Sequence, residues 1–92
     1  MMRKSDLVEV IARKAHLTKK AATEALETFI SEVEKALVKG EKVVLSGFGT
    51  FKVVNVKEKS VIVPKTGERK TIKPHRAPRF SAGRSLRKLI KG

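Results

Sequence analysis

Residues whose types and spacing could support catalysis are few in this sequence. The histidines, His16 and His75, have no partner at a metal-ligand or catalytic-triad spacing, and the chain contains no cysteine. The stretch GFGTFK, from Gly47 to Lys52, lacks the third glycine of a dinucleotide fingerprint, and a strand rather than a helix is expected after it. We therefore predict a protein that is not an enzyme, holds no metal ion or cofactor and takes no small-molecule substrate.

Basic residues are the strongest chemical signal instead. The 92 residues carry a formal net charge of +13, and residues 41–92 contain 14 Lys and Arg against three Asp and Glu. A basic surface this one-sided predicts a polyanionic partner. Seven of the basic residues lie in one stretch that has few residues able to bury: Lys57, Lys59, Lys65, Arg69, Lys70, Lys73 and Arg76.

That stretch has the pattern of a long β-hairpin. The segment NVKEKSVIV is expected to be a strand, Pro64 to Gly67 a turn, and GERKTIKP the returning strand. The ribbon contains no aromatic residue, whereas proteins that bind single strands stack bases on aromatic rings. A thin basic ribbon fits a groove of a double helix, so we predict double-stranded nucleic acid as the partner. Pro64 suits a hairpin tip in any protein, and an apolar tip can also enter a base step.

Two helices are expected in the part of the chain before this ribbon. Apolar residues recur at helical spacing from Leu7 to Ala15, and Ser5 or Asp6 would cap this first helix. Thr18 would cap a longer second helix, which Gly40 would end in the left-handed conformation.

Strands and a last helix complete the predicted body. KVVLSGFGTFKVV alternates and predicts two strands around a turn at residues 46–49, and APRF predicts a short strand ending at Phe80. Ser81 would cap a final helix whose Leu86, Leu89 and Ile90 face inward. The predicted fold is α+β: a base of two helices, a three-stranded antiparallel sheet with a long ribbon arm, and a C-terminal helix.

The second helix has an apolar stripe too wide for a fragment this small to cover. A domain of this size buries only ~60% of its unfolded surface, and self-association is the usual remedy. We therefore predict a dimer with no stable folded monomer. Its core is expected to contain Leu26, Phe29, Ile30, Val33, Leu37, Phe48, Phe51 and Phe80. No stretch approaches the ~20 apolar residues of a membrane span, so we expect a cytoplasmic protein without a membrane partner.

Three segments together resemble the HU/IHF family of bacterial DNA-bending proteins, HU more closely than integration host factor. They are GFGTF at residues 47–51, Pro64-x-Thr66-Gly67 seventeen residues further on, and APRFSAGRSLRKL, which is similar to the family's Pro-x-Phe-x-x-Gly-Lys-x-Leu-Lys. The resemblance covers essentially the whole chain. It implies one domain, with a body at residues 1–53 and 77–92 and an arm at about 54–76.

The resemblance also implies a function and its residues. An intertwined dimer, identical or mixed, would bend, wrap and compact nucleoid DNA with little sequence preference. Its arms would lie in the minor groove, with Pro64 intercalating at each tip. Phosphate contacts on the body would come from Lys4, Ser46, Gly47, Arg79, Arg84 and Arg87.

The arm departs from the family pattern. Val61-Ile62-Val63 stands where the family usually has Gly-Arg-Asn, and Val54 and Val56 stand where arginines are frequent. The returning strand must then supply more of the positive charge. The apolar residues either extend the wedge or strengthen strand pairing. Two other functions stay open on the residues: a site-specific bender like integration host factor, and an RNA-binding basic protein.

Overall fold

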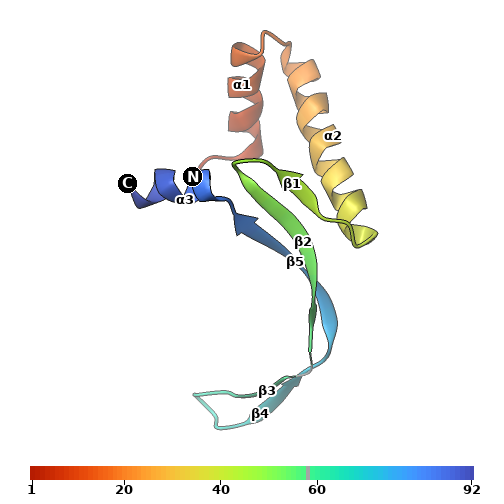
Figure 1. The fold of residues 1–92 in the computed structure, drawn as a ribbon, viewed down its shortest axis with the longest axis vertical. Coiled ribbons are helices and arrows are strands. Elements are labelled where there is room, and N and C mark those ends of the chain that lie inside the picture. Colours follow the sequence, from red (N-terminus) through yellow and green to blue (C-terminus); the bar gives the residue numbers. More distant parts are fainter. Residues whose placement is uncertain (58) are drawn as a thin grey trace. The chain divides into compact units, whose positions relative to one another are not determined.

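The computed structural model describes the backbone of residues 1–57 and 59–92, and the side chains of Lys59, Val61 and Ile72 lie outside the described part. The chain divides into two compact units, residues 1–35 and 36–92. The elements follow the order of two helices, five strands and one helix (Figure 1). The predicted α+β class is confirmed.

The first unit is a helical hairpin of α1 (Lys4–Lys14) and most of α2 (Lys19–Val38) (Figure 1). The prediction that Ser5 or Asp6 caps α1 is wrong, because Arg3 occupies the cap position. Asp6 acts from one turn inside the helix, where its carboxylate accepts the Arg3 backbone N–H at 2.9 Å. The predicted cap of α2 is confirmed: the Thr18 hydroxyl accepts the Ala21 N–H at 3.0 Å.

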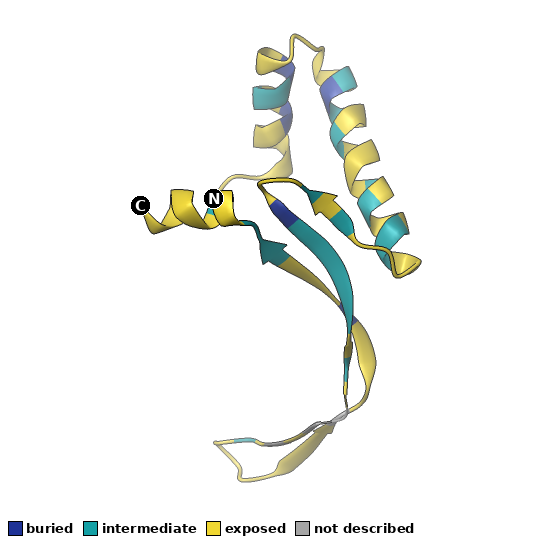
Figure 2. Ribbon diagram, in the orientation of Figure 1, coloured by how far each residue is buried: buried dark blue, intermediate teal, exposed yellow. Residues whose placement is uncertain are grey.

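The core of this unit is small. Val8, Ala12 and Ala22 are buried, and Ile11 and Leu26 pack against them. Two large side chains of α2 remain outside it, since Phe29 is 43% and Ile30 39% exposed. Figure 2 shows most of the α2 ribbon as exposed or half-buried. The unit therefore presents an apolar surface that a single chain leaves in water.

The second unit is built on an antiparallel sheet. Its strands are β1 (Val43–Leu45), β2 (Gly49–Val56) and β5 (His75–Ala82), in the order β1-β2-β5. A separate two-stranded ribbon, β3 (Lys59–Ile62) with β4 (Arg69–Ile72), continues from β2 and β5 and forms the predicted arm (Figure 1).

The short strand predicted from APRF is longer at both ends. It starts at His75 and ends at Ala82, because Ser81 and Ala82 continue to pair with Thr50 and Gly49 of β2. Ser81 is therefore not a helix cap, and Gly83 takes that position before α3 (Arg84–Lys91). The extension depends on cross-strand hydrogen bonds, which a local sequence signal does not report.

An aromatic cluster explains the GFGTF segment. The Phe80 ring lies with its centroid 4.9 Å from that of Phe51 and 5.4 Å from that of Phe48. A Cβ on Gly49 would come within 2.5 Å of the Phe80 ring and 2.6 Å of the Ser81 carbonyl oxygen. Only glycine fits between the two strands here.

The predicted inward face of the last helix is only partly right. Leu86 is half-buried, but Leu89 is 80% and Ile90 78% exposed. The start of α3 is held to the turn between β1 and β2, since the Gly83 N–H donates to the Phe48 carbonyl at 2.8 Å. The later turns extend beyond that attachment, so their apolar side chains are not covered within one chain.

The residues predicted for a dimer core are incompletely covered within one chain. Four are half-buried and four are exposed. The half-buried residues are Leu26, Val33, Leu37 and Phe51, and the exposed ones are Phe29, Ile30, Phe48 and Phe80. Aromatic and branched side chains that are this exposed indicate that another protein surface packs against them.

Candidate nucleic-acid interface

The tip of the arm is a tight turn between β3 and β4. Gly67 has a φ of 71°, and its N–H donates to the Val63 carbonyl at 2.8 Å. The Val63 N–H donates to the Glu68 carbonyl at 2.8 Å and closes the ribbon. Pro64 is exposed at this tip, where its missing N–H interrupts no ladder. The tip thus presents a rigid apolar ring to the outside.

An apolar side chain and a basic one share the last ribbon pair before the tip. Ile62 lies opposite Arg69, and Ile62 is 65% exposed. Cross-strand neighbours on one face lie about 5 Å apart at Cβ. Ile62 therefore pairs across the ribbon and still leaves apolar surface beside the tip.

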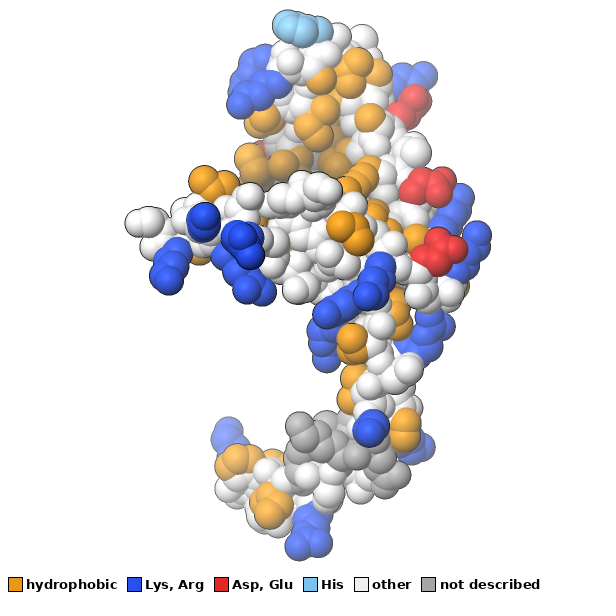
Figure 3. All heavy atoms as spheres, in the orientation of Figure 1, with side chains coloured by type: hydrophobic (Ala, Val, Ile, Leu, Met, Phe, Trp, Pro, Cys, Tyr) orange, Lys and Arg blue, Asp and Glu red, His pale blue; other side chains and the backbone are white. Residues whose placement is uncertain are grey.

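Most of the predicted basic arm residues project into solvent. Lys57, Lys65, Arg69, Lys70 and Lys73 are all exposed, while the side chain of Lys59 lies outside the described part. Figure 3 shows Lys and Arg side chains on the ribbon and around α3. The three ion pairs found among the described residues all lie within residues 1–35. The five exposed lysines and arginines named above are therefore available to an outside anion.

Arg76 differs from the other arm residues. It is also exposed, but its Nη2 group donates to the carbonyls of Leu37 and Val38, each at 3.1 Å. Both carbonyls belong to the last turn of α2. The structure thus gives this predicted DNA-contacting residue a partner inside the protein.

Three of the predicted body contacts come together at one place. Ser46 and Gly47 form the exposed turn after β1, where Gly47 has a φ of 83°. A Cβ on Gly83, the residue before Arg84, would lie 3.3 Å from the Gly47 carbonyl carbon. The turn therefore borders the start of α3, whose unpaired N–H groups favour an anion.

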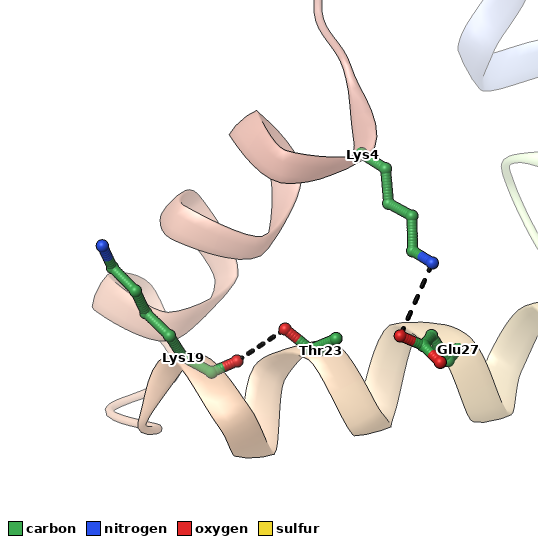
Figure 4. Close-up of polar contacts among 4 residues, drawn as sticks. All are labelled: Lys4, Lys19, Thr23 and Glu27. Atoms are coloured by element: carbon green, nitrogen blue, oxygen red, sulfur yellow. Dashed lines mark hydrogen bonds and ion pairs between the residues drawn. The ribbon is translucent and has the colours of Figure 1, made fainter.

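The remaining predicted body contacts lie apart. Arg87 is exposed one turn further along α3, and Arg79 is exposed on β5, opposite Lys52 of β2. Lys52 was absent from the predicted contacts, although strand alternation after Phe51 places it on the opposite face from the aromatic cluster. In the first unit, Lys4 lies 3.6 Å from the Glu27 carboxylate in an exposed ion pair (Figure 4). Such pairs are weak, about 0–1 kcal/mol, so Lys4 can exchange this partner.

The described part of the chain offers neither a metal-binding cluster nor a membrane span. No group of three or more His, Asp or Glu residues there is arranged to hold a metal ion. No helix there has the length and apolar character needed to cross a bilayer.

Proteins named HU are similar to this chain over almost its whole length. HU-alpha of Vibrio cholerae is 46% identical over 90 residues, which cover 98% of this chain and 100% of that protein. HU-beta 2 of Neisseria meningitidis is 41% identical over 91 residues, covering 99% and 100%.

Solved structures match the fold at similar coverage. An Anabaena HU–DNA cocrystal structure has a TM-score of 0.87 and 38% identity, over 97% of each chain. HU from Thermotoga maritima has a TM-score of 0.69 and 30% identity, over 97% of this chain and 98% of that one. The family described as bacterial DNA-binding protein matches residues 2–91. The chain therefore belongs to the bacterial DNA-binding protein family, and the HU/IHF resemblance of its sequence is confirmed.

Proposed function

We propose that this protein binds double-stranded DNA with little sequence preference and bends, wraps and compacts it through the minor groove. The arm is the observation that carries the proposal. Its described cations are exposed, and its two strands pair with each other while none of their described residues is buried. A ribbon of this kind gains contacts only from an outside partner. The likeness to an HU crystallised with DNA supports duplex DNA as that partner.

The arm and the body have different parts in this function. On the arm, Lys57, Lys59, Lys65 and the basic residues of the returning strand neutralise phosphates beside the groove. Pro64 enters a base step at the tip and kinks the duplex. Unstacking a step costs a few kcal/mol, and the wider contact with bent DNA offsets that cost.

The body holds the flanks of the bent duplex. The turn at Ser46 and Gly47, with Arg84 and the N–H groups at the start of α3, forms one phosphate contact. Arg79 and Arg87 add charge, and Lys4 adds a third cation when it leaves Glu27. These contacts position the DNA without reading its sequence, so affinity depends on salt more than on base composition.

A second copy of the chain completes the fold in this proposal. The exposed Phe29 and Ile30, 43% and 39% accessible in one chain, become part of a shared core. Because a single chain cannot cover this surface, we expect no compact folded monomer at low micromolar concentration. Sedimentation measures this directly, and a folded monomer there would contradict the dimer. A mixed dimer with a related chain would satisfy the same requirement.

The remaining parts of the proposal concern role and location. The protein acts as an architectural component rather than as an enzyme, because phosphate contacts and an apolar wedge require no catalytic group. It acts on chromosomal DNA, in the nucleoid of the cytoplasm.

A band-shift series tests the proposed function. Intact, nicked and cruciform duplexes of matched length are compared with single-stranded RNA at equal salt. We expect nicked and cruciform DNA to bind best, intact duplexes of different sequence to bind alike, and RNA to bind weakly. A preference of about tenfold for one duplex sequence, or ~1.4 kcal/mol, would favour a site-specific bender. Stronger binding to RNA would refute the proposal.

A further inference from the structure

Arg76 connects two segments that are far apart along the chain. It is the second residue of β5 and pairs with Asn55 of β2. Its Nη2 group carries two hydrogens and reaches the carbonyls of Leu37 and Val38, 39 and 38 residues earlier, both at 3.1 Å. All of these residues belong to the second unit, residues 36–92.

The end of α2 explains why a guanidinium binds there. Gly40, with a φ of 82°, and Glu41 donate their N–H groups to the carbonyls of Leu37 and Ala36, each at 2.9 Å. This is the Schellman motif, which leaves the carbonyl of Val38 without a backbone donor. Arg76 supplies that donor, and its positive charge faces the negative end of the helix dipole.

The position of Arg76 along the ribbon gives this contact a consequence. The next residue, Ala77, is only 8% exposed and belongs to the sheet of the body. Beyond Arg76, towards the tip, the hydrogen bonds found among the described residues join only β2 to β5, join β3 to β4, or remain local to the ribbon. Arg76 is thus the last described side chain that ties the ribbon to a helix.

Arg76 also lines a pocket together with residues from the end of α2. The pocket has a volume of about 240 Å³ and is mainly apolar apart from the arginine. Its lining residues are Leu37, Val38, Val53, Arg76, Ala77 and Pro78. An arginine can bury its aliphatic stem along such a wall while its charged end reaches the helix carbonyls.

We propose that Arg76 is a positioning residue: it fixes the root of the arm to the C-terminus of α2 and thereby sets the direction in which the arm meets DNA. This role rests on the proposed function. Because its Nη2 group is held by two helix carbonyls, we expect Arg76 to contribute to the bend and not to be counted among the phosphate contacts. The other exposed arm cations, such as Arg69, keep the phosphate role.

The test compares Arg76→Gln with a matched control, Arg69→Gln, which removes the same charge from the ribbon near its tip. Three quantities are measured on the full chain. They are the exchange rates of the Gly40 and Glu41 amides in the free protein, the slope of log affinity against log salt, and end-to-end energy transfer on a doubly labelled duplex at saturating protein.

For Arg76→Gln we expect amide exchange at Gly40 and Glu41 to accelerate by about threefold or more, as the removal of a favourable charge at a helix end predicts. The salt slope stays as in the parent, and energy transfer falls. For Arg69→Gln the slope becomes shallower by about 0.9 for each phosphate that is no longer neutralised, while exchange at the helix end is unchanged.

Each contrary result overturns the proposal. A salt slope that is shallower by about 0.9 or more in Arg76→Gln identifies a phosphate contact instead. If the amides of Gly40 and Glu41 exchange at the parent rate in Arg76→Gln, the contact with the helix end is refuted. If energy transfer is unchanged in this variant, the positioning role is refuted. If Arg76→Gln does not fold, Arg76→Lys keeps the charge but loses the planar fork, and a fall in energy transfer is then the deciding result. A parent protein that neither binds nor bends duplex DNA refutes the proposed function itself, whereas the exchange rates of the free protein still report the helix contact.

Discussion

Replacing Pro64 with alanine distinguishes its proposed role as an intercalating wedge from its role as a turn residue. The turn itself is little affected, because its hydrogen bonds run from Gly67 to Val63 and from Val63 to Glu68, each at 2.8 Å, and none uses residue 64 as a donor. Proline at a compatible position contributes only about 0.4–1 kcal/mol, mainly by restricting the unfolded chain. The free energy of unfolding of Pro64→Ala should therefore fall by no more than about 1 kcal/mol.

The effect on DNA should be larger than the effect on stability. Every charge of the arm remains, so phosphate-led affinity for an intact duplex should fall only about fivefold, equivalent to ~1 kcal/mol. Bending should fall more, since the apolar ring that enters the base step is gone. Nicked or kinked duplexes already have part of their stacking disrupted, so their binding should be least affected.

Energy transfer across a labelled duplex measures the bend, with affinity recorded in parallel on intact and nicked DNA. Arg69→Gln is a useful companion, because it removes a charge and leaves Pro64 in place; its affinity should become less salt-dependent. If Pro64→Ala bends intact DNA as strongly as the parent, the wedge is refuted and Pro64 is only a turn residue.

Two further predictions concern the body. Gly49→Ala should destabilise the protein by about 1–3 kcal/mol, since the new Cβ would meet the Phe80 ring at 2.5 Å and the Ser81 carbonyl oxygen at 2.6 Å. Thermal melts at fixed protein concentration should show that the melting temperature falls by at least about 4 °C. An unchanged melting temperature would contradict the close approach. Arg84→Ala combined with Arg87→Ala should flatten the salt slope by up to about 0.9 for each phosphate that these residues neutralise in the parent, without changing sequence preference. That slope comes from titrations at several salt concentrations, and a parent-like slope would exclude both residues from phosphate binding.

Local signals were enough to define the second helix and the hairpins. Thr18 and Gly40 mark the ends of α2 because capping and left-handed backbone depend on a few neighbouring residues. The ribbon followed from its alternation and from Pro64 and Gly67, and its charge pointed to a polyanion without any knowledge of the fold. The three family segments extended this to the whole architecture.

Features that depend on distant residues required the tertiary structure. The length of β5 follows from the pairing of Ser81 with Thr50. Ile90 is exposed because no other part of the same chain packs against it. The role of Gly49 appears only when Phe80 is placed across the strands. Neither the charge pattern nor the alternation predicts these features, because each depends on residues at a large separation in sequence.

Arg76 shows the same division at a single residue. The sequence determined its charge and its place on a basic ribbon, and these predicted a DNA contact. Only the tertiary structure brings it to the carbonyls of Leu37 and Val38, at the end of a helix some 38 residues earlier. A guanidinium is attracted both to phosphate and to the negative end of a helix, so its chemistry alone does not select the partner. The partner is selected by the fold, in which Arg76 pairs with Asn55 of β2 and lies within hydrogen-bonding distance of that helix end.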